Sequence, residues 1–336
     1  MHIGSWSFPN AVFVAPMAGV TDRPYRRLCK ALGAGHAVSE MAASNPRLWN
    51  SVKTSRRINH EGEPAPVSVQ IAGSDPGMMA EAAIFNIEKG AKIIDINMGC
   101  PAKKVCNVVS GSALLRDENR IAEILESVVE ACLPYGIPVT LKTRTGWDRD
   151  SINALRIAHL AQESGIAALT LHGRTRCDFY TGNAEYENIK EVKANVKIPI
   201  IANGDIDSPE KAKYVLEYTQ ADAIMIGRAA QGRPWIFREV DHFLQHGTYL
   251  APPTFGELQA LLLDHLEDHY SFYGEFTGVR TARKHIGWYF AHLPDAKAWL
   301  ASVNQIESTQ EQLQTISQWF EQQDAHAPFI HEPVAA

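Results

Sequence analysis

The chain has 336 residues, of which 45% are hydrophobic and 21% charged, and its formal net charge is −6 at pH 7. This composition is ordinary for a folded globular protein and excludes collagen-like, coiled-coil or globally disordered chains. No apolar run approaches the roughly 20 residues of a membrane helix, and the first residues, MHIGSWSFPN, do not have the pattern of a signal peptide. The five cysteines are scattered without CxxC spacing, so we expect a cytoplasmic protein with no disulfide framework, no membrane segment and no metal.

One pattern recurs along the first part of the chain. A short apolar, β-branched run ends in a turn that carries Gly, Asn or Arg, and an amphipathic stretch follows. Eight such runs occur, at residues 12–19, 37–41, 67–73, 93–99, 139–146, 168–175, 198–205 and 223–230. Because most intervals leave room for a crossover helix, the pattern predicts an α/β fold of the (β/α)₈ TIM barrel type. A doubly wound sheet is the alternative, but neither GxGxxG nor a Walker A motif follows the first run.

The pattern changes at Pro252-Pro253, where the β-branched runs stop. Apolar residues at helical spacing then follow through residues 255–266, 279–290 and 306–320. We therefore predict a barrel domain over residues 1–250, a small C-terminal helical bundle over 251–323 and a flexible tail over 324–336.

Barrel active sites lie where the strands end, so the residues at those positions are the first candidates. They are Met17, Glu40, Gln70, Asn97, Lys142, Arg144, His172, Arg174, Asn203, Asp205 and Arg228. Lys142 shares a strand face with Thr140 and Arg144 by two-residue alternation, which directs a cation into the barrel mouth if that face is interior. A buried cation needs a partner that offsets its desolvation, and this favours a functional role for Lys142.

Two glycine turns end the last two runs, Asn203-Gly204-Asp205 and Gly227-Arg228. In barrels these loops commonly hold a phosphate group, because glycine lets backbone N–H groups approach the anion. The alternative is that the glycines serve tight turns only.

Cys100 stands between Gly99 and Pro101 at the end of the fourth run, where neither helix nor regular strand encloses it. Lys103 and Lys104 follow on the same loop. Such a thiol could be a nucleophile, a proton donor or a metal ligand. Cys106 would be the second ligand, but the spacing does not fit a metal clip, so a metal is not expected.

Several segments together resemble the tRNA-dihydrouridine synthases, specifically the bacterial B subfamily. They are APMAGVTDRPYR, SEM, VQIAG, DINMGCPAKKV, GSALL, LKTRTGW, HGRTR, ANGDI and MIGRAAQGRPWIF, between about Phe13 and Phe237, and then GVRTARKHIGWY. The resemblance implies an FMN-binding barrel joined to a helical tRNA-binding domain. It further implies reduction of the C5–C6 bond of D-loop uridines, with NADPH as reductant.

The resemblance also assigns roles to individual residues. Pro16, Met17 and Ala18 would line the flavin ring, Gln70 would hydrogen-bond its pyrimidine edge, and Lys142 and His172 would contact it. The ribityl phosphate would be held by Asn203, Gly204, Asp205, Gly227 and Arg228. Cys100 would give a proton to uracil C5 after hydride transfer from flavin N5 to C6, a role that needs the neutral thiol, whose ordinary pKa is about 8.5.

A tRNA substrate has to be reconciled with the negative net charge. After residue 253 there are four Lys and Arg against eleven Asp and Glu, so RNA binding must depend on clustered basic residues. Arg280, Arg283 and Lys284 share one helix face at i, i+3 and i+4 spacing, beside His285, Trp288 and Tyr289. The remaining predicted substrate contacts, at the barrel mouth, are Asn97, Lys103, Lys104, Arg144 and Arg174. A merely solvated helix face is the alternative for the C-terminal cluster.

Three other functions remain open at this point. The first is an FMN oxidoreductase of a free pyrimidine, which would not explain the helical domain. The second is a Schiff-base aldolase that uses Lys142, and the third is a non-catalytic RNA-binding protein. A monomer is the simplest expectation, and the sequence does not indicate which uridine is modified.

Overall fold

The computed structural model describes residues 1–49, 51–106, 110–291, 293 and 296–330. The chain divides into two compact units, Met1–Gly227 and Arg228–Ala336. This division falls earlier in the sequence than residue 250, and the expected functional domain boundaries stay predictions.

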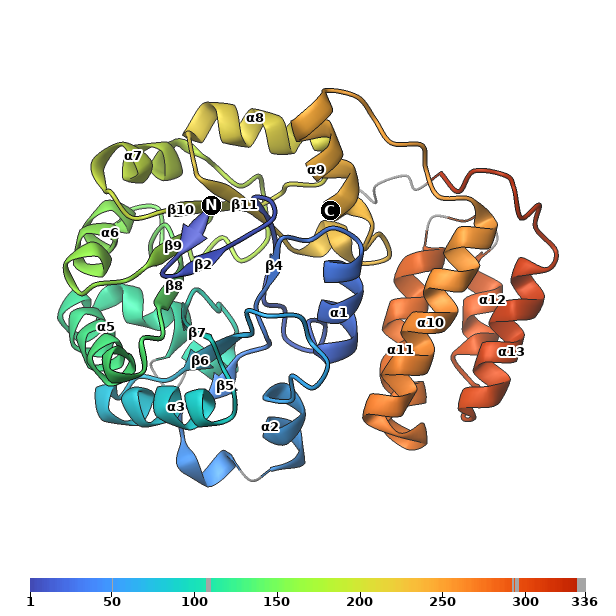
Figure 1. Cartoon of the computed structure of the whole chain (residues 1–336), viewed down its shortest axis with the longest axis horizontal. Coiled ribbons are helices and arrows are strands. Elements are labelled where there is room, and N and C mark those ends of the chain that lie inside the picture. The colour runs from blue at the N-terminus through green and yellow to red at the C-terminus, as the bar shows by residue number, and fades with distance from the viewer. Residues whose placement is uncertain (50, 107–109, 292, 294–295, 331–336) are drawn as a thin grey trace. The chain divides into compact units, whose positions relative to one another are not determined.

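The first unit is built on a nine-stranded parallel sheet in the order β4-β3-β11-β10-β9-β8-β7-β6-β5. The strands are β3 (Val12–Val14), β4 (His36–Ala37), β5 (Ala42–Ala43), β6 (Ser68–Ala72), β7 (Ile93–Met98), β8 (Val139–Arg144), β9 (Ala168–His172), β10 (Ile200–Asn203) and β11 (Ala223–Ile226). The sheet curls at the centre of this unit (Figure 1). Val38, directly after β4, forms a parallel bridge with Ser68 of β6, so the two ends of the strand order meet. The barrel prediction is confirmed, although the second expected run, 37–41, shares only Ala37 with β4 and ends directly before β5.

Helices cover the outside of the curled sheet (Figure 1). They are α1 (Arg23–Ala31), α3 (Pro76–Glu88), α5 (Glu118–Cys132), α6 (Ala154–Glu163), α7 (Glu187–Asn195) and α8 (Pro209–Thr219), while α2 (Val52–Arg57) and α4 (Lys103–Cys106) lie in the connections that follow β5 and β7. Local sequence explains where they begin: the Asp75 and Ser208 side chains accept hydrogen bonds from the third backbone N–H that follows, with proline at the first helical position. A two-stranded antiparallel ribbon, β1 (His2–Ile3) and β2 (Trp6–Ser7), precedes the barrel.

The central strands are buried on both faces, as a parallel sheet between helices requires. In β7, Ile93, Ile94 and Ile96 are fully buried, yet Asp95 and Asn97 alternate with them and are buried as well. In a barrel interior, such polar positions have to be satisfied by one another. Asp95 and Asn97 belong to the candidate site described below.

The second unit is helical. Its helices are α9 (Ile236–His246), α10 (Phe255–Tyr273), α11 (Glu275–Phe290), α12 (Ala296–Val303) and α13 (Thr309–Phe320). A capping box of Thr254 and Glu257 starts α10. Phe290 of α11 packs against Trp299, Trp319 and Phe320 of the last two helices, which supplies an aromatic core. Among the residues described, no helix combines the length and apolarity that crossing a bilayer demands.

Candidate active site

A buried carboxylate lies inside the barrel on β7. The Asp95 side chain accepts hydrogen bonds from Thr140 Oγ1 at 2.6 Å and from Gln70 Nε2 at 2.7 Å. Burial is the main cause that raises the pKa of this carboxyl to about 6, while the two hydrogen bonds and the charge of Lys142 act in the opposite direction. Asp95 thus orients the Gln70 amide and supplies negative charge below the barrel mouth.

From Gln70 the hydrogen bonds continue toward the carboxyl end of β7. Asn97 Nδ2 donates to Gln70 Oε1 at 2.8 Å, and Asn97 Oδ1 accepts from the backbone N–H of Cys100 at 3.0 Å. Asn97 shares the interior face of β7 with Asp95, because residues two apart on a strand point the same way, and Gln70 lies opposite Asp95 in the register of β6 and β7. An unbroken series of hydrogen bonds therefore joins the barrel interior to the Cys100 loop.

The Cys100 loop is fixed on its other side as well. The Cys100 carbonyl accepts hydrogen bonds from Ser112 Oγ at 2.8 Å and from the Ser112 backbone N–H at 3.2 Å. Gly111 has a φ of +62°, and a Cβ there would lie 2.9 Å from the Cys100 carbonyl oxygen, so the close approach needs glycine. The half-buried thiol is consequently held at the carboxyl end of the barrel, as predicted.

The protonation state of Cys100 follows from its surroundings. Burial, the largest cause, raises the pKa of the thiol above its ordinary value, and the nearby Arg144 guanidinium acts in the opposite direction. The thiol is neutral at pH 7 and can donate a proton. It is a weak nucleophile in this state, because nucleophilic attack needs the thiolate.

Lys142 points into the barrel, as the alternation along β8 predicts. Its ammonium donates to Asn203 Oδ1 at 2.8 Å, and Asn203 Nδ2 donates to the Met225 carbonyl at 2.8 Å. Burial, followed by repulsion from Arg144, lowers the pKa of Lys142 to about 8, and Asp95 opposes this shift. Lys142 is mainly charged at pH 7, and Asp95 is the countercharge that its burial requires.

The two arginines expected to meet substrate at the barrel mouth are both buried. Arg144 donates from Nε to the Gly99 carbonyl at 2.9 Å and from Nη1 to the carbonyls of Thr175 and Phe179 at 2.7 and 2.8 Å. Arg174 forms a bidentate pair with Asp205, at 2.9 and 2.6 Å. In this arrangement both guanidinium groups hold loops together, and direct contact with substrate stays a prediction.

The predicted phosphate turn after β10 has unusual backbone geometry. Gly204 has a φ of +127°, and a Cβ there would lie 2.7 Å from Ala184 Cβ and 3.1 Å from His172 Cδ2. The next residue, Asp205, has a φ of +46°. The glycine is therefore required for the turn itself, so the tight-turn explanation accounts for Gly204 without any ligand.

The other expected cofactor contacts lie at the same ends of their strands. Pro16 and Met17 are half-buried and Ala18 is exposed after β3, which neighbours β11 in the sheet. A Cβ on Gly227, directly after β11, would lie 3.7 Å from Met17 Sδ. Arg228 follows as an exposed residue at the start of a short 3₁₀ turn (Arg228–Ala230). The strand register thus gathers the two segments that were expected to meet one cofactor.

Some expected substrate contacts cannot be compared with a described side chain. The side chains of Lys103 and Lys104 lie outside the described residues, although the backbone forms α4.

On α11, Arg280 pairs with Glu307 at 2.7 Å and stacks on Phe276, while Arg283 donates to the Ile306 carbonyl at 3.1 Å. The basic face of α11 is present, and part of its charge is engaged within the second unit.

The residue set fits a flavin. The amide of Gln70 and the ammonium of Lys142 are side-chain donors that can approach the carbonyl edge of an isoalloxazine, and both belong to the buried interior network. Asp95 was not singled out from the sequence, and Thr140 was named only for sharing a strand face with Lys142. Their signal was available, because Asp95 lies two residues before Asn97 and Thr140 two residues before Lys142.

Comparison with known proteins gives consistent matches. The family model described as dihydrouridine synthase matches residues 13–324. The tRNA-dihydrouridine synthase B of Pseudomonas aeruginosa is 58% identical over 320 residues, which are 95% of this chain and 96% of that protein. Its namesake in Vibrio cholerae is 57% identical over 321 residues, with 96% and 99% covered.

Solved structures agree at the level of the fold. Morphinone reductase has a TM-score of 0.52 at 14% identity, and the match covers 77% of this chain and 91% of that one. Histamine dehydrogenase from Rhizobium sp. 4-9 has a TM-score of 0.57 at 13% identity, with 80% and 50% covered. At these identities the structures show a shared barrel and nothing further.

Proposed function

The chain belongs to the dihydrouridine synthase family, and on that premise we propose that it is a flavin enzyme that reduces uridine to dihydrouridine in tRNA. The observation that carries the proposal is the near full-length match to B-type enzymes together with the hydrogen-bonded connection from Asp95 to the Cys100 loop. The B subfamily resemblance seen in the sequence is confirmed.

We assign FMN as the flavin and NADPH as the reductant. Gln70 and Lys142 would meet the ring, with His172, Pro16, Met17 and Ala18 around it. Asn203, Gly204, Asp205, Gly227 and Arg228 would hold the phosphate end, where Arg228 adds a charge-assisted donor. When bound, the flavin supplies a hydride to uracil C6.

The protein then has to protonate C5. Cys100 is suited to this step because its thiol is neutral and half-buried, and because Asn97 and Ser112 fix its backbone. Lys142 holds positive charge in the barrel interior, which stabilises negative charge that develops on reduction. The uridine has to leave the RNA stack to reach this interior.

The proposed direct substrate contacts are Asn97, Lys103 and Lys104 in the first unit and Arg280, Arg283 and Lys284 in the second. Arg144 and Arg174 act by positioning loops, given their buried contacts. We place the reaction in the cytoplasm, where tRNA and NADPH are both present.

The test uses purified enzyme, NADPH and either unmodified tRNA or free uracil. We expect a yellow protein with a flavin spectrum that forms dihydrouridine in tRNA, detected by mass spectrometry of nucleosides, and leaves uracil unchanged. Reduction of uracil at a comparable kcat/KM would favour the free-pyrimidine alternative. A colourless protein that borohydride traps on a carbonyl substrate would favour the aldolase.

A further inference from the structure

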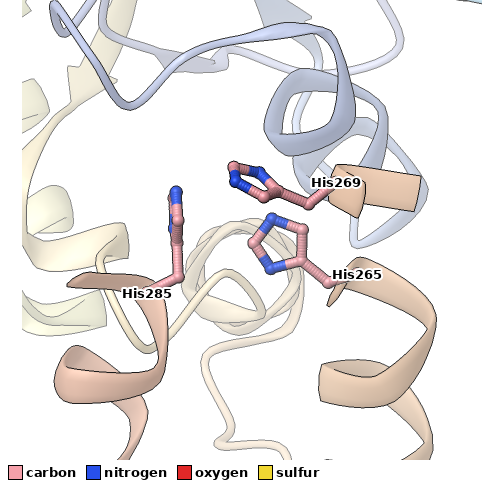
Figure 2. Close-up of side chains that lie close together, drawn as sticks. All are labelled: His265, His269 and His285. Carbon is pink, nitrogen blue, oxygen red and sulfur yellow. The ribbon is translucent and has the colours of Figure 1, made fainter. Parts of the chain in front are cut away.

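Three histidine side chains are buried together in the second unit, and none of the three has been assigned a role in the reaction. His265 and His269 lie one turn apart on α10, and His285 lies on α11, which packs against it. None of the three is more than 3% exposed. Figure 2 shows the three rings facing one another across the space between the two helices.

The three rings bring one nitrogen each close to one another. One ligand atom from each histidine lies within 4.8 Å of the other two. The ring planes cross at 80°, 82° and 65°, so the rings meet edge to face and do not stack. Nitrogens around a tetrahedral zinc ion lie roughly 3.3 Å apart for bonds of about 2.0 Å, which small side-chain rotations could reach from this starting point.

The protonation state suits metal ligation. Burial, the largest cause, lowers the pKa of His265 to about 4 and that of His269 to about 3, and places the pKa of His285 well below its ordinary value. All three imidazoles are neutral at pH 7, and neutral imidazole is the form that binds a metal. A hydrogen bond of 2.8 Å between His269 Nε2 and Thr281 Oγ1 fixes that ring, in the manner of outer partners of metal-bound histidines.

We propose that His265, His269 and His285 bind one divalent transition-metal ion of the zinc class, which links α10 to α11 and stabilises the helical unit. Imidazole ligands suit zinc, cobalt, nickel and copper and disfavour magnesium and calcium. Water completes the coordination. The role is structural and does not depend on the proposed reaction.

One neighbouring charge opposes the ion. Lys284, the residue before His285, lowers the pKa of all three histidines by repulsion and would repel a metal ion in the same way. Lys284→Gln should therefore tighten metal binding several-fold. This result is specific to a cation between the rings, because a purely apolar role of the histidines would not respond to the charge of Lys284.

The experiment uses the full chain without a histidine tag, stripped with a chelator and titrated with Co²⁺. We expect one Co²⁺ per chain with the visible absorption of a low-coordinate imidazole site, displacement by Zn²⁺, and a higher Tm with Zn²⁺. His285→Ala and His285→Gln should lose the absorption and the Tm increase. His242→Ala is the matched control, because His242 and His246 also form an i, i+4 pair, with ring centroids 4.6 Å apart on α9.

Measurements on the wild-type protein test the metal site even if the variants fold poorly. X-ray absorption of the Co²⁺ complex of the wild-type protein should show three imidazole ligands. This measurement does not require any variant. The proposal is overturned if the wild-type chain binds no ion under these conditions, if the complex contains fewer than three imidazoles, or if a folded His285→Gln variant keeps both the absorption and the Tm increase.

Discussion

Asn97 holds the Cys100 loop from inside the barrel, with its Oδ1 accepting the Cys100 backbone N–H at 3.0 Å. Its Nδ2 donates to Gln70, so a single side chain connects the loop that carries the thiol to the interior that is expected to meet the flavin. The position of the sulfur thus depends on a residue that need not take part in any bond change.

Replacing Asn97 tests this connection. Asn97→Ala should retain flavin and lower dihydrouridine formation by roughly 100-fold, since displacement of a reacting group by about 1 Å can have that effect. Single-turnover rates and flavin absorption measure the two quantities. Asn188→Ala is the control and should change neither, because it removes a side-chain amide that donates to Glu185 at 2.9 Å at the start of α7. A normal rate for Asn97→Ala would show that the loop is positioned without this residue.

Asp95 predicts a pH dependence of stability. Its pKa is raised from 3.8 to about 6 by burial, so the native state binds a proton that the unfolded state releases between these values. The contribution of Asp95 to the free energy of unfolding therefore decreases as pH rises from 4 to 6, by about 3 kcal/mol at most. Asp95→Asn removes this titration, so the difference in stability between wild type and variant should change with pH.

Urea unfolding of both proteins at pH 4, 5, 6 and 7 measures that difference. As the pH rises, the free energy of unfolding of Asp95→Asn should increase relative to that of the wild type. This holds even if the variant is less stable at every pH because the Gln70 amide loses an acceptor. A constant difference across the range would mean that Asp95 is ionised throughout and that Lys142 compensates its burial fully.

Lys142 predicts the alkaline limit of activity. Its folded pKa of about 8 means that the ammonium is lost as pH rises through that value, and with it the charge that stabilises reduction. The rate of uridine reduction should fall above pH 8. Lys142→Met should lower the rate by roughly 100- to 1000-fold and abolish this pH limit. Lys193→Met removes a lysine that pairs with Asp222 on the outside of the barrel and should behave as wild type. If the rate of Lys142→Met still falls above pH 8, the alkaline limit belongs to the titration of another group.

The basic face of α11 predicts how tRNA binding depends on salt. Arg280→Ala should weaken binding and reduce the slope of log K against log salt by about one, if Arg280 contacts a phosphate. Glu307→Gln should strengthen binding, because it releases Arg280 from its ion pair of 2.7 Å. Lys297→Ala, an exposed lysine on α12, is the control. Affinity that stays flat from low to moderate salt would contradict the clustered-patch hypothesis.

The sequence predicted most reliably what depends on local periodicity. Alternation along β8 put Lys142 on one face with Thr140 and Arg144, which proves to be the interior face, and start signals such as Asp75-Pro76 predicted helix starts. It could not predict that Gln70, Asp95 and Asn97 form one network, because that depends on which strands are neighbours and in which register. The histidine cluster was missed for the same reason, since His285 meets His265 and His269 only once α11 packs on α10.

Two arginines show a further limit. Arg144 ends β8 and Arg174 follows β9, at positions where exposed substrate contacts are expected. Each is nevertheless buried by loops that supply carbonyl or carboxylate acceptors. Loop paths of this kind depend on tertiary packing, and no spacing rule in the sequence indicates them.

The role of Cys100 is tested most directly by the yield of dihydrouridine in a single turnover of flavin-reduced enzyme with tRNA. Cys100→Ala should keep flavin and tRNA binding and lower the rate by roughly 100- to 10,000-fold, the range of a lost general acid. The Cys106 thiol lies 3.6 Å from the Cys100 carbonyl oxygen, and the control Cys106→Ala should retain activity within a few-fold. A Cys100→Ala rate equal to that of the Cys106→Ala control would contradict proton donation by this thiol.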